Sequence, residues 1–166
     1  RSTLFPYTTL FRSRSSKAIV NGLKEWFDDM DEENLKSFDE SYVRYMLNEK
    51  LIQINNEIHE KQERCCSTVA FALTFGDKTL IGNIGDSMVY GYDEYNDALV
   101  PYTTLDSYSR GLSYEDARRN PYNRYITASV GGNYVNPGTE FMHSVVIPNQ
   151  GQHLLLASDG VIDLTS

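Results

Sequence analysis

The sequence predicts an α+β protein in which two helices pack on an antiparallel sheet. Between Ser16 and Lys61, apolar side chains recur every three or four residues, which is the period of helices buried on one side. After Cys65 β-branched and aromatic residues predominate, and the large apolar residues Val69, Phe71, Leu73 and Phe75 occupy every second position. Gly, Pro and Asn then separate short apolar runs as far as residue 157. No internal repeat is visible, and the length of 166 residues predicts one domain or part of a larger one.

The first helical pattern begins at Ser16 and has one apolar face, formed by Ile19, Leu23, Trp26, Phe27 and Met30. The mostly acidic residues 28–33 interrupt this face and are expected to form a solvated connection. A second helix is predicted to start at a capping box. Ser37 and Glu40 have the spacing of that motif, and the helical pattern after them continues towards Lys61.

The strands are predicted from alternating apolar residues between turn-forming residues. Residues 68–75 and 79–84 flank the turn Gly-Asp-Lys and are expected to form a hairpin. Residues 93–123 are polar, rich in tyrosine and irregular, with one short helix at residues 113–119. Further strands are predicted at residues 88–92, 125–130, 141–147 and 153–157.

Composition excludes several classes of protein. The 166 residues carry 15 basic and 23 acidic side chains, a net charge of −8, which argues against a nucleic-acid surface or an anchor on anionic lipid. No apolar run is long enough to cross a bilayer. The two cysteines, Cys65 and Cys66, are adjacent, so they neither build a disulfide framework nor have metal-ligand spacing. We expect a monomeric, cytoplasmic protein with no membrane segment and no nucleic-acid partner.

Residues 1–13 are predicted not to belong to the domain. The string RSTLFPYTTLFRS has no helical or strand period, and its Pro6 and missing small-residue cleavage site argue against a signal peptide. Residues 3–13 resemble the in-frame translation of a sequencing adapter; the alternative is an ordinary threonine-rich tail. We expect residues 1–13 to be an artefactual, non-native leader and residues 14–166 to be a partial domain.

Three aspartates stand where carboxylates often bind hard cations. Asp159 follows the uninterrupted apolar run at residues 154–157, which predicts a strand buried on both faces, and precedes Gly160. Asp86 lies in the comparable sequence Gly-Asp-Ser, and Asp163 follows Asp159 by four residues. Mg²⁺ and Mn²⁺ prefer such oxygen ligands. Each aspartate taken alone is better explained as a turn residue.

Other catalytic arrangements are not found in the sequence. Ser158 lacks the glycines of a nucleophile elbow, and the chain has neither a phosphate-binding loop nor a dinucleotide-binding pattern of glycines. The three histidines, His59, His143 and His153, lack zinc-ligand spacing. Several aspartates without a histidine or cysteine nucleophile are typical of metal-activated water attacking a phosphoryl group.

Four segments in the same order resemble the metal-dependent protein serine/threonine phosphatases of type 2C, especially the compact bacterial kind. Residues 67–70 (STVA) resemble a strand start of that family and follow the helix ending at residues 55–58 (NNEI). Residues 80–87 (LIGNIGDS) resemble its Val-Gly-Asp-Ser-Arg strand, and residues 123–132 (NRYITASVGG) resemble a further motif. Residues 154–163 (LLLASDGVID) match its Leu-Leu-Leu-Cys-Ser-Asp-Gly-Leu-x-Asp motif.

The resemblance implies an αββα-sandwich fold and a set of functions. Asp159 would be a ligand of a two-metal Mg²⁺ or Mn²⁺ centre, and Asp86 and Asp163 would help to hold a third ion. Residues 93–122 would form the variable flap beside the active site. A metal-bridging hydroxide would hydrolyse phosphoserine or phosphothreonine monoesters, with no catalytic residue beyond the metal ligands. The substrates would be phosphorylated proteins in a signalling pathway, in opposition to a serine/threonine kinase.

The chain also departs from the family pattern. The N-terminal Arg-x-x-Asn-Glu-Asp and Asp-Gly-x-Gly-Gly motifs and the C-terminal Asp-Asn motif are absent, and Met88 replaces the usual arginine. We therefore expect a fold truncated at both ends, an inactive and marginally stable polypeptide, and an active parent protein. Two alternatives stay open: a catalytically dead relative that acts as a regulatory or binding module, and an unrelated α+β interaction domain.

Overall fold

A computed structural model describes residues 3–8, 14–30, 39–61, 65–108, 110–122 and 125–158. For residues 3, 5–8, 114, 117 and 118 it describes the backbone alone. Among these described residues, no helix is long and apolar enough to cross a membrane.

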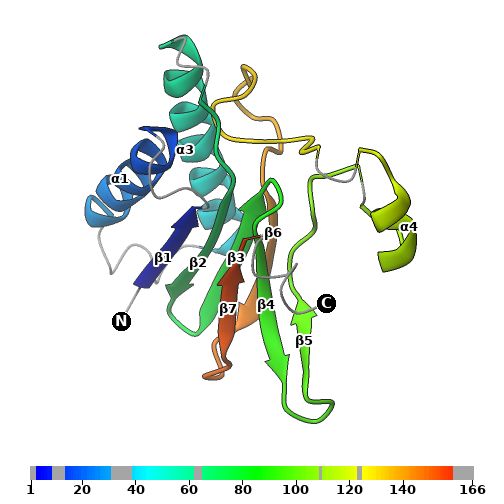
Figure 1. Cartoon of the computed structure of the whole chain (residues 1–166). Helices are drawn as coiled ribbons and strands as arrows, with labels where there is room; N and C mark the ends of the chain where they lie inside the picture. The colour runs from blue at the N-terminus through cyan, green and yellow to red at the C-terminus, as the bar shows by residue number, and fades with distance from the viewer. Residues whose placement is uncertain are drawn as a thin grey trace.

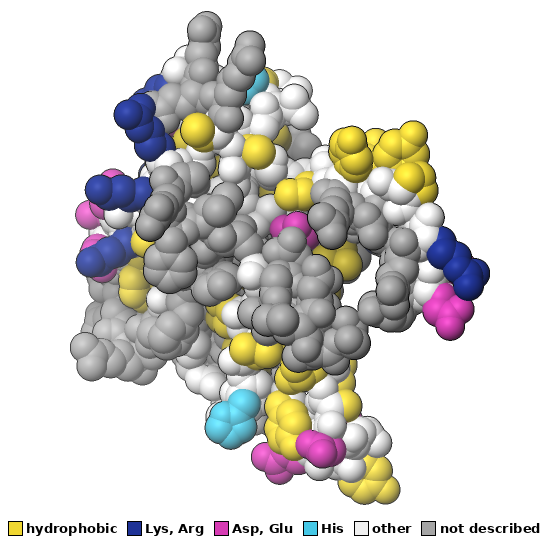
Figure 2. All heavy atoms as spheres, in the orientation of Figure 1, with side chains coloured by type: hydrophobic (Ala, Val, Ile, Leu, Met, Phe, Trp, Pro, Cys, Tyr) yellow, Lys and Arg dark blue, Asp and Glu magenta, His cyan; other side chains and the backbone are white. Residues whose placement is uncertain are grey.

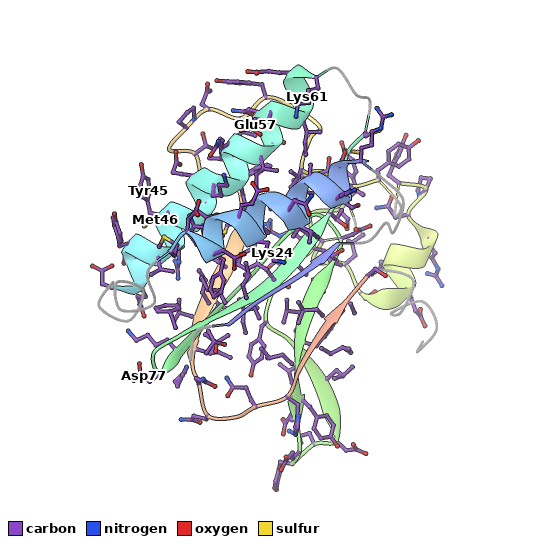
Figure 3. The ribbon with its side chains drawn as sticks, turned by 90° about the vertical axis from the view of Figure 1, so that its left-hand side faces the viewer. Lys24, Tyr45, Met46, Glu57, Lys61 and Asp77 are labelled. Atoms are coloured by element: carbon purple, nitrogen blue, oxygen red, sulfur yellow. The ribbon has the colours of Figure 1, made fainter. Side chains whose placement is uncertain are left out.

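The described residues form three layers, in the order helix, sheet, sheet (Figure 1). Helices α1 (Arg14–Asp28) and α3 (Glu40–Glu60) lie side by side on the larger sheet (Figure 3). That sheet has the order β1-β2-β3-β6, with bounds Thr3–Thr8, Val69–Phe75, Lys78–Ile84 and His143–Pro148. The smaller sheet has the order β5-β4-β7, with bounds Ala98–Pro101, Met88–Asp93 and Leu154–Ala157. Short helix α4 (Tyr114–Arg119) projects away from the layers.

The alternation of side chains along β2 creates two cores. Phe71 is fully buried on the helix side, where it packs in a cluster with Ile19 of α1 and Leu47 of α3. Ala70, its neighbour in the chain, is buried on the opposite side with Val89 of β4. The larger sheet is therefore covered on both faces. This confirms the α+β prediction and the prediction that the helices pack on the sheet.

The hairpin predicted at residues 68–84 is confirmed. β2 and β3 pair antiparallel, from Val69 opposite Ile84 to Phe75 opposite Lys78. Gly76 at the turn has φ of 57°, a left-handed conformation that glycine adopts without steric cost. The predicted short helix after residue 113 is also present, as α4.

Several sequence predictions were wrong in detail. The second helix begins at Glu40 with Asp39 as its N-cap, whose carboxylate accepts the Tyr42 N–H at 2.7 Å; Ser37 lies outside the described residues. The segment 125–130 makes only isolated bridges instead of a strand, and strand β5 was not predicted. Strand β7 is not buried on both faces: Leu155 is 39% exposed, because it lies on the outer face of the smaller sheet, which no other described layer covers.

The structure places Thr3–Thr8 as a strand beside β2, with Thr3 opposite Thr74 and Thr8 opposite Val69. Pro6 is compatible with this position, because β1 lies at an edge of the described sheet and proline is tolerated there. Strand pairing uses main-chain groups, which every sequence provides. The pairing thus does not identify the origin of residues 1–13, and the domain boundary at residue 14 remains a prediction.

The outer face of the smaller sheet is apolar and open to solvent among the described residues. Tyr92 of β4 and Leu99 of β5 are paired in register, and both are exposed, as is Leu155 of β7. Helices α1 and α3 lie on the other side of the larger sheet (Figure 1). In the part of the chain that the structure describes, no helix packs on this outer face.

Candidate functional site

Asp86 is the one predicted metal ligand that lies within the described residues. It occupies the loop Gly85–Ser87 that joins β3 to β4, and its side chain is half-buried. Asp159 and Asp163 lie outside the described residues. The described part of the candidate site consists of the loop that holds Asp86 and of strand β7, which precedes Asp159 in the sequence.

Gly85 fixes the shape of the Asp86 loop. Its φ of 97° lies in the left-handed region, where residues with a side chain are strained. The backbone also passes so close to Thr68 that a Cβ on Gly85 would lie 2.2 Å from Thr68 Cγ2. The Thr68 hydroxyl lies 2.8 Å from the Ser87 hydroxyl on the other side of Asp86. Thr68 thus contacts both residues that flank the aspartate.

Asn83, at the end of β3, holds the Asp86 loop through hydrogen bonds of its buried side chain. The residue is fully buried, and its amide nitrogen donates to three carbonyl oxygens: Gly85 at 3.2 Å, Ser87 at 3.0 Å and Thr104 at 2.9 Å. A buried amide that satisfies three carbonyls stabilises one loop conformation, because each carbonyl would otherwise be left unpaired. Asn83 Oδ1 has no hydrogen-bond partner in the described structure.

Asp106 connects the same loop to β6. Its backbone N–H donates to the Gly85 carbonyl at 2.9 Å, and its Oδ2 accepts the Gly85 N–H at 2.9 Å. Its Oδ1 lies 2.6 Å from His143 Nε2 at the start of β6. The Asp106 carboxylate is therefore engaged through both oxygens and acts as a structural support for the Asp86 loop.

The sequence analysis missed Asn83, Asp106 and His143 as parts of this site. Asn83 lies inside the motif at residues 80–87, where an amide at the end of a buried strand is a usable signal for a loop anchor. Asp106 falls in the segment read as irregular, and His143 was considered only for zinc spacing. These two residues are separated by 37 positions in the chain, so no local pattern joins them.

Strand β7 precedes Asp159 in the sequence, and it pairs with β4, which follows Asp86. Met88 is paired with Ala157. Asp86 precedes Met88 by two residues, and Asp159 follows Ala157 by two residues in the sequence. The strand that leads to Asp159 thus ends beside the strand that starts after Asp86.

The described residues alone do not make a metal centre. Among them, no group of three histidine, cysteine, aspartate or glutamate side chains is close enough to hold an ion. The two-metal centre that the family resemblance implies needs several convergent carboxylates, and Asp86 provides only one of them. The donor set predicted from the sequence therefore depends on residues outside the described part of the chain.

A cluster of exposed tyrosines lies in the predicted flap, residues 93–122, and just after it. The rings of Tyr108 and Tyr122 are 6.1 Å apart, those of Tyr122 and Tyr125 are 5.7 Å apart, and all three are more than half exposed. Figure 2 shows hydrophobic side chains gathered at the end of the molecule where α4 projects. Asp106 links the segment after the flap to the Asp86 loop, because its carbonyl accepts the Thr127 N–H at 2.7 Å while its own N–H donates to the Gly85 carbonyl.

Helix α3 fixes a further motif, the segment around Gly131. Fully buried Asn55 accepts the Gly131 N–H at 2.7 Å and donates to the Asn133 carbonyl at 2.8 Å. Asn56 binds both the carbonyl and the N–H of Val135. These contacts give a physical reason for the asparagines near the end of the helix.

Comparison with known proteins gives the family. The model described as Protein phosphatase 2C matches residues 15–166, so the chain belongs to the protein phosphatase 2C family. No significant match to a curated protein was found.

Solved structures of bacterial phosphatases are similar in fold. Serine/threonine phosphatase Stp1 from Staphylococcus aureus has a TM-score of 0.73 at 18% identity, with 98% of this chain and 77% of that chain covered. The S. agalactiae serine/threonine phosphatase has a TM-score of 0.72 at 16% identity, covering 98% and 81%. The Mycobacterium tuberculosis serine/threonine phosphatase PstP/Ppp has a TM-score of 0.64 at 19% identity, with 98% of this chain and 80% of that chain covered. These likenesses confirm the predicted fold class.

Proposed function

We propose that residues 14–166 are part of a metal-dependent phosphatase that hydrolyses phosphoserine and phosphothreonine monoesters. One observation supports this proposal beyond family membership: Met88, two residues after Asp86, is paired with Ala157, two residues before Asp159. The two aspartates are 73 positions apart in the sequence, and a site shared between them requires the strands next to them to be neighbours.

Asp86, Asp159 and Asp163 are the proposed ligands of Mg²⁺ or Mn²⁺, two or three ions in the complete domain. Their oxygen donors fit these hard cations. When bound, the ions would supply activation of water and neutralisation of phosphoryl charge. The residues of this chain would orient Asp86: Asn83 and Asp106 hold its loop on one side, and Thr68 contacts Gly85 and Ser87.

The proposed substrates are phosphorylated proteins, with a serine/threonine kinase as the opposing enzyme in a signalling pathway. The exposed tyrosines of the flap support a protein substrate, because aromatic side chains are favoured at protein contacts. We propose that the protein is cytoplasmic and monomeric. Its acidic charge supports a role without nucleic acid.

The polypeptide of residues 1–166 is proposed to lack activity by itself. It contains no Asp-Gly-x-Gly-Gly motif, and a two-metal centre needs several convergent carboxylates. The second candidate function, a catalytically dead regulatory or binding module, is favoured by the same missing motif and by Met88 in place of an arginine.

The test compares two proteins, residues 1–166 and the product of the coding sequence that flanks residues 14–166 in the source DNA. Both are assayed with Mn²⁺ on p-nitrophenyl phosphate and on a phosphothreonine peptide. We expect no turnover by residues 1–166 and turnover by the longer product. Asp159→Asn in the longer product should abolish turnover, and Asp77→Asn, at an exposed turn (Figure 3), should leave it unchanged.

The outcomes separate the candidates. Mn²⁺-dependent turnover by residues 1–166 would contradict the proposed inactivity. A longer product that contains an Asp-Gly-x-Gly-Gly motif and hydrolyses neither substrate would contradict the phosphatase proposal. A longer product without that motif, folded but inactive, would favour the binding module.

A further inference from the structure

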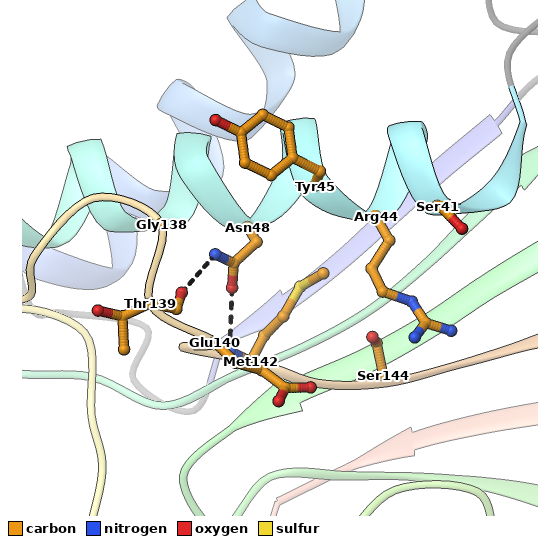
Figure 4. A pocket seen from close by; sticks show the side chains of 9 residues that line it. All are labelled: Ser41, Arg44, Tyr45, Asn48, Gly138, Thr139, Glu140, Met142 and Ser144. Carbon is orange, nitrogen blue, oxygen red and sulfur yellow. Dashed lines mark hydrogen bonds between the residues drawn. The ribbon is translucent and has the colours of Figure 1, made fainter.

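A cavity of about 270 Å³ lies between helix α3 and strand β6, on the helix side of the larger sheet (Figure 4). Arg44 and Ser41 of α3 line it, together with Ser144 of β6. Ser144 pairs with Gly82, whereas its neighbour His143 pairs with Asn83 and reaches Asp106 on the other face of the sheet. The cavity is therefore separate from the Asp86 loop.

Arg44 is a half-buried cation whose side chain makes no hydrogen bond or ion pair in the described structure. Its Nε is shielded from solvent and has no acceptor. A buried donor without a partner costs free energy, and more when the group is charged. Arginine donates through a planar fork that fits the paired oxygens of a carboxylate or phosphate. The unused donors of Arg44 thus match an oxyanion.

The surroundings of Arg44 provide further donors. The hydroxyls of Ser41 and Ser144 line the same cavity, and in Figure 4 the Arg44 side chain extends from α3 towards Ser144. The far wall is rigid, because Asn48 binds the Thr139 carbonyl at 2.7 Å and the backbone N–H groups of Phe141 and Met142. A small anion in this cavity would therefore meet one cation and two hydroxyl groups beside a wall that is held by hydrogen bonds.

The charges around the cavity leave Arg44 available. Glu140 also lines the cavity, but it is exposed and forms no ion pair with Arg44. Glu40, at the start of the same helix, is paired with Lys78 at 3.3 Å. Glu49 accepts the Gly138 N–H at 2.9 Å. Two of the three nearby carboxylates are therefore engaged elsewhere, and the third is at the rim.

We propose that this cavity binds a small oxyanion, a phosphate or a carboxylate group, through the guanidinium of Arg44 and the hydroxyls of Ser41 and Ser144. The anion supplies the acceptor that Arg44 Nε lacks. A single cation in an acidic protein makes the binding weak and sensitive to salt. The site does not depend on the proposed catalytic metals.

The test follows the arginine side-chain Nε–H resonances of the ¹⁵N-labelled chain by NMR, together with the backbone amide resonances of the cavity residues 139–144, which are also present in the variants. Metal ions are first removed on a chelating resin so that no metal-dependent site contributes, and sodium phosphate and sodium acetate are then titrated separately at constant ionic strength. We expect the Arg44 resonance to shift and saturate with at least one of the two anions. Arg44→Gln should weaken binding at least about tenfold, and Ser144→Ala by about threefold.

Lys24→Gln is the matched control, because it removes one exposed cation on α1, away from the cavity (Figure 3). Saturation by phosphate alone or by acetate alone supports the proposal and identifies the group recognised. The proposal is overturned if neither anion saturates the Arg44 resonance, or if Lys24→Gln weakens binding as much as Arg44→Gln. Should Arg44→Gln fail to fold, unchanged binding by folded Ser144→Ala together with no shift at Arg44 overturns it.

Discussion

Asp106 Oδ1 lies 2.6 Å from His143 Nε2, and the other oxygen of the same carboxylate accepts the Gly85 N–H at 2.9 Å. One side chain thus joins the start of β6 to the loop that carries Asp86. The bond to Gly85 is buried, and its loss would leave a main-chain donor without an acceptor. The position of Asp86 therefore depends on a residue 20 positions later in the sequence.

Removing this carboxylate is expected to destabilise the chain. Asp106→Ala should lower the free energy of unfolding by about 2–3 kcal/mol, because the buried Gly85 N–H loses its acceptor. Asp106→Asn should cost about 1 kcal/mol, since the amide oxygen still accepts from Gly85. Urea unfolding followed by circular dichroism measures both. Asp77→Ala, at an exposed turn, should stay within about 0.5 kcal/mol; equal losses for Asp106→Ala and Asp77→Ala would contradict this role.

Alanine substitutions at Gly76 and Gly85, which both have a left-handed φ, distinguish the cost of backbone strain from the cost of side-chain crowding. Gly76→Ala should cost about 1 kcal/mol, because its φ of 57° is strained for alanine but no atom lies within 4 Å of the added Cβ. Gly85→Ala should cost about 3 kcal/mol, because the added Cβ also meets Thr68 Cγ2. Thermal unfolding of the two variants tests the difference. Equal costs would show that Thr68 moves away freely.

The sequence was informative where local patterns decide the structure. The β2–β3 hairpin was predicted because a glycine turn separates two alternating runs, and the buried Ile19 and Leu23 were on the predicted apolar face of the first helix. Strand propensity failed at residues 125–130, where Ile126 and Val130 each form only a single bridge. Propensity describes a segment, but a strand also needs a neighbour with which to pair.

The candidate site was less predictable than the fold. Asp86 was identified because Gly-Asp-Ser follows a buried strand, but its supports come from Asn83, Asp106 and His143, which converge only in three dimensions. The expected double burial of residues 154–157 failed for a related reason. An apolar run does not reveal whether another layer covers both faces of its strand, and Leu155 faces solvent.

Asn83 provides an isosteric test of the loop. Asn83→Asp replaces a donor with a carboxylate oxygen that would face three carbonyl oxygens in a fully buried position. We expect the free energy of unfolding to fall by at least about 3 kcal/mol at neutral pH, because a buried charge without partners is strongly unfavourable. Asn133→Asp, which introduces the same charge at an exposed position, is the control and should stay within about 0.5 kcal/mol. Urea midpoints that fall equally in both variants would refute the assigned donor role.

Tyr92 is expected to make stability fall at alkaline pH. Its hydroxyl donates to Asp97 Oδ1 at 2.6 Å, and this bond raises the pKa of Tyr92 above its ordinary value of 10.0, with burial and the charge of Asp93 adding to the effect. A group whose pKa is higher in the folded than in the unfolded protein stabilises the folded state fully at a pH below its pKa in the unfolded protein. This stabilisation disappears as the pH rises through the pKa of the group in the folded protein. The hairpin contact is therefore present at neutral pH and is lost above pH 10.

The Tyr92 titration is followed by NMR of the ring carbon that bears the hydroxyl. Asp97→Asn removes the negative charge but keeps a side chain suited to the left-handed φ of 49° at this position. We expect the pKa of Tyr92 to fall towards 10.0 in that variant, because ionised Tyr92 no longer faces a carboxylate and can accept the amide N–H instead. The Tyr92→Phe variant should lose the alkaline decline in stability that the Tyr92 hydroxyl causes. An unchanged Tyr92 midpoint in Asp97→Asn would mean that the hydrogen bond is not the main cause of the raised pKa.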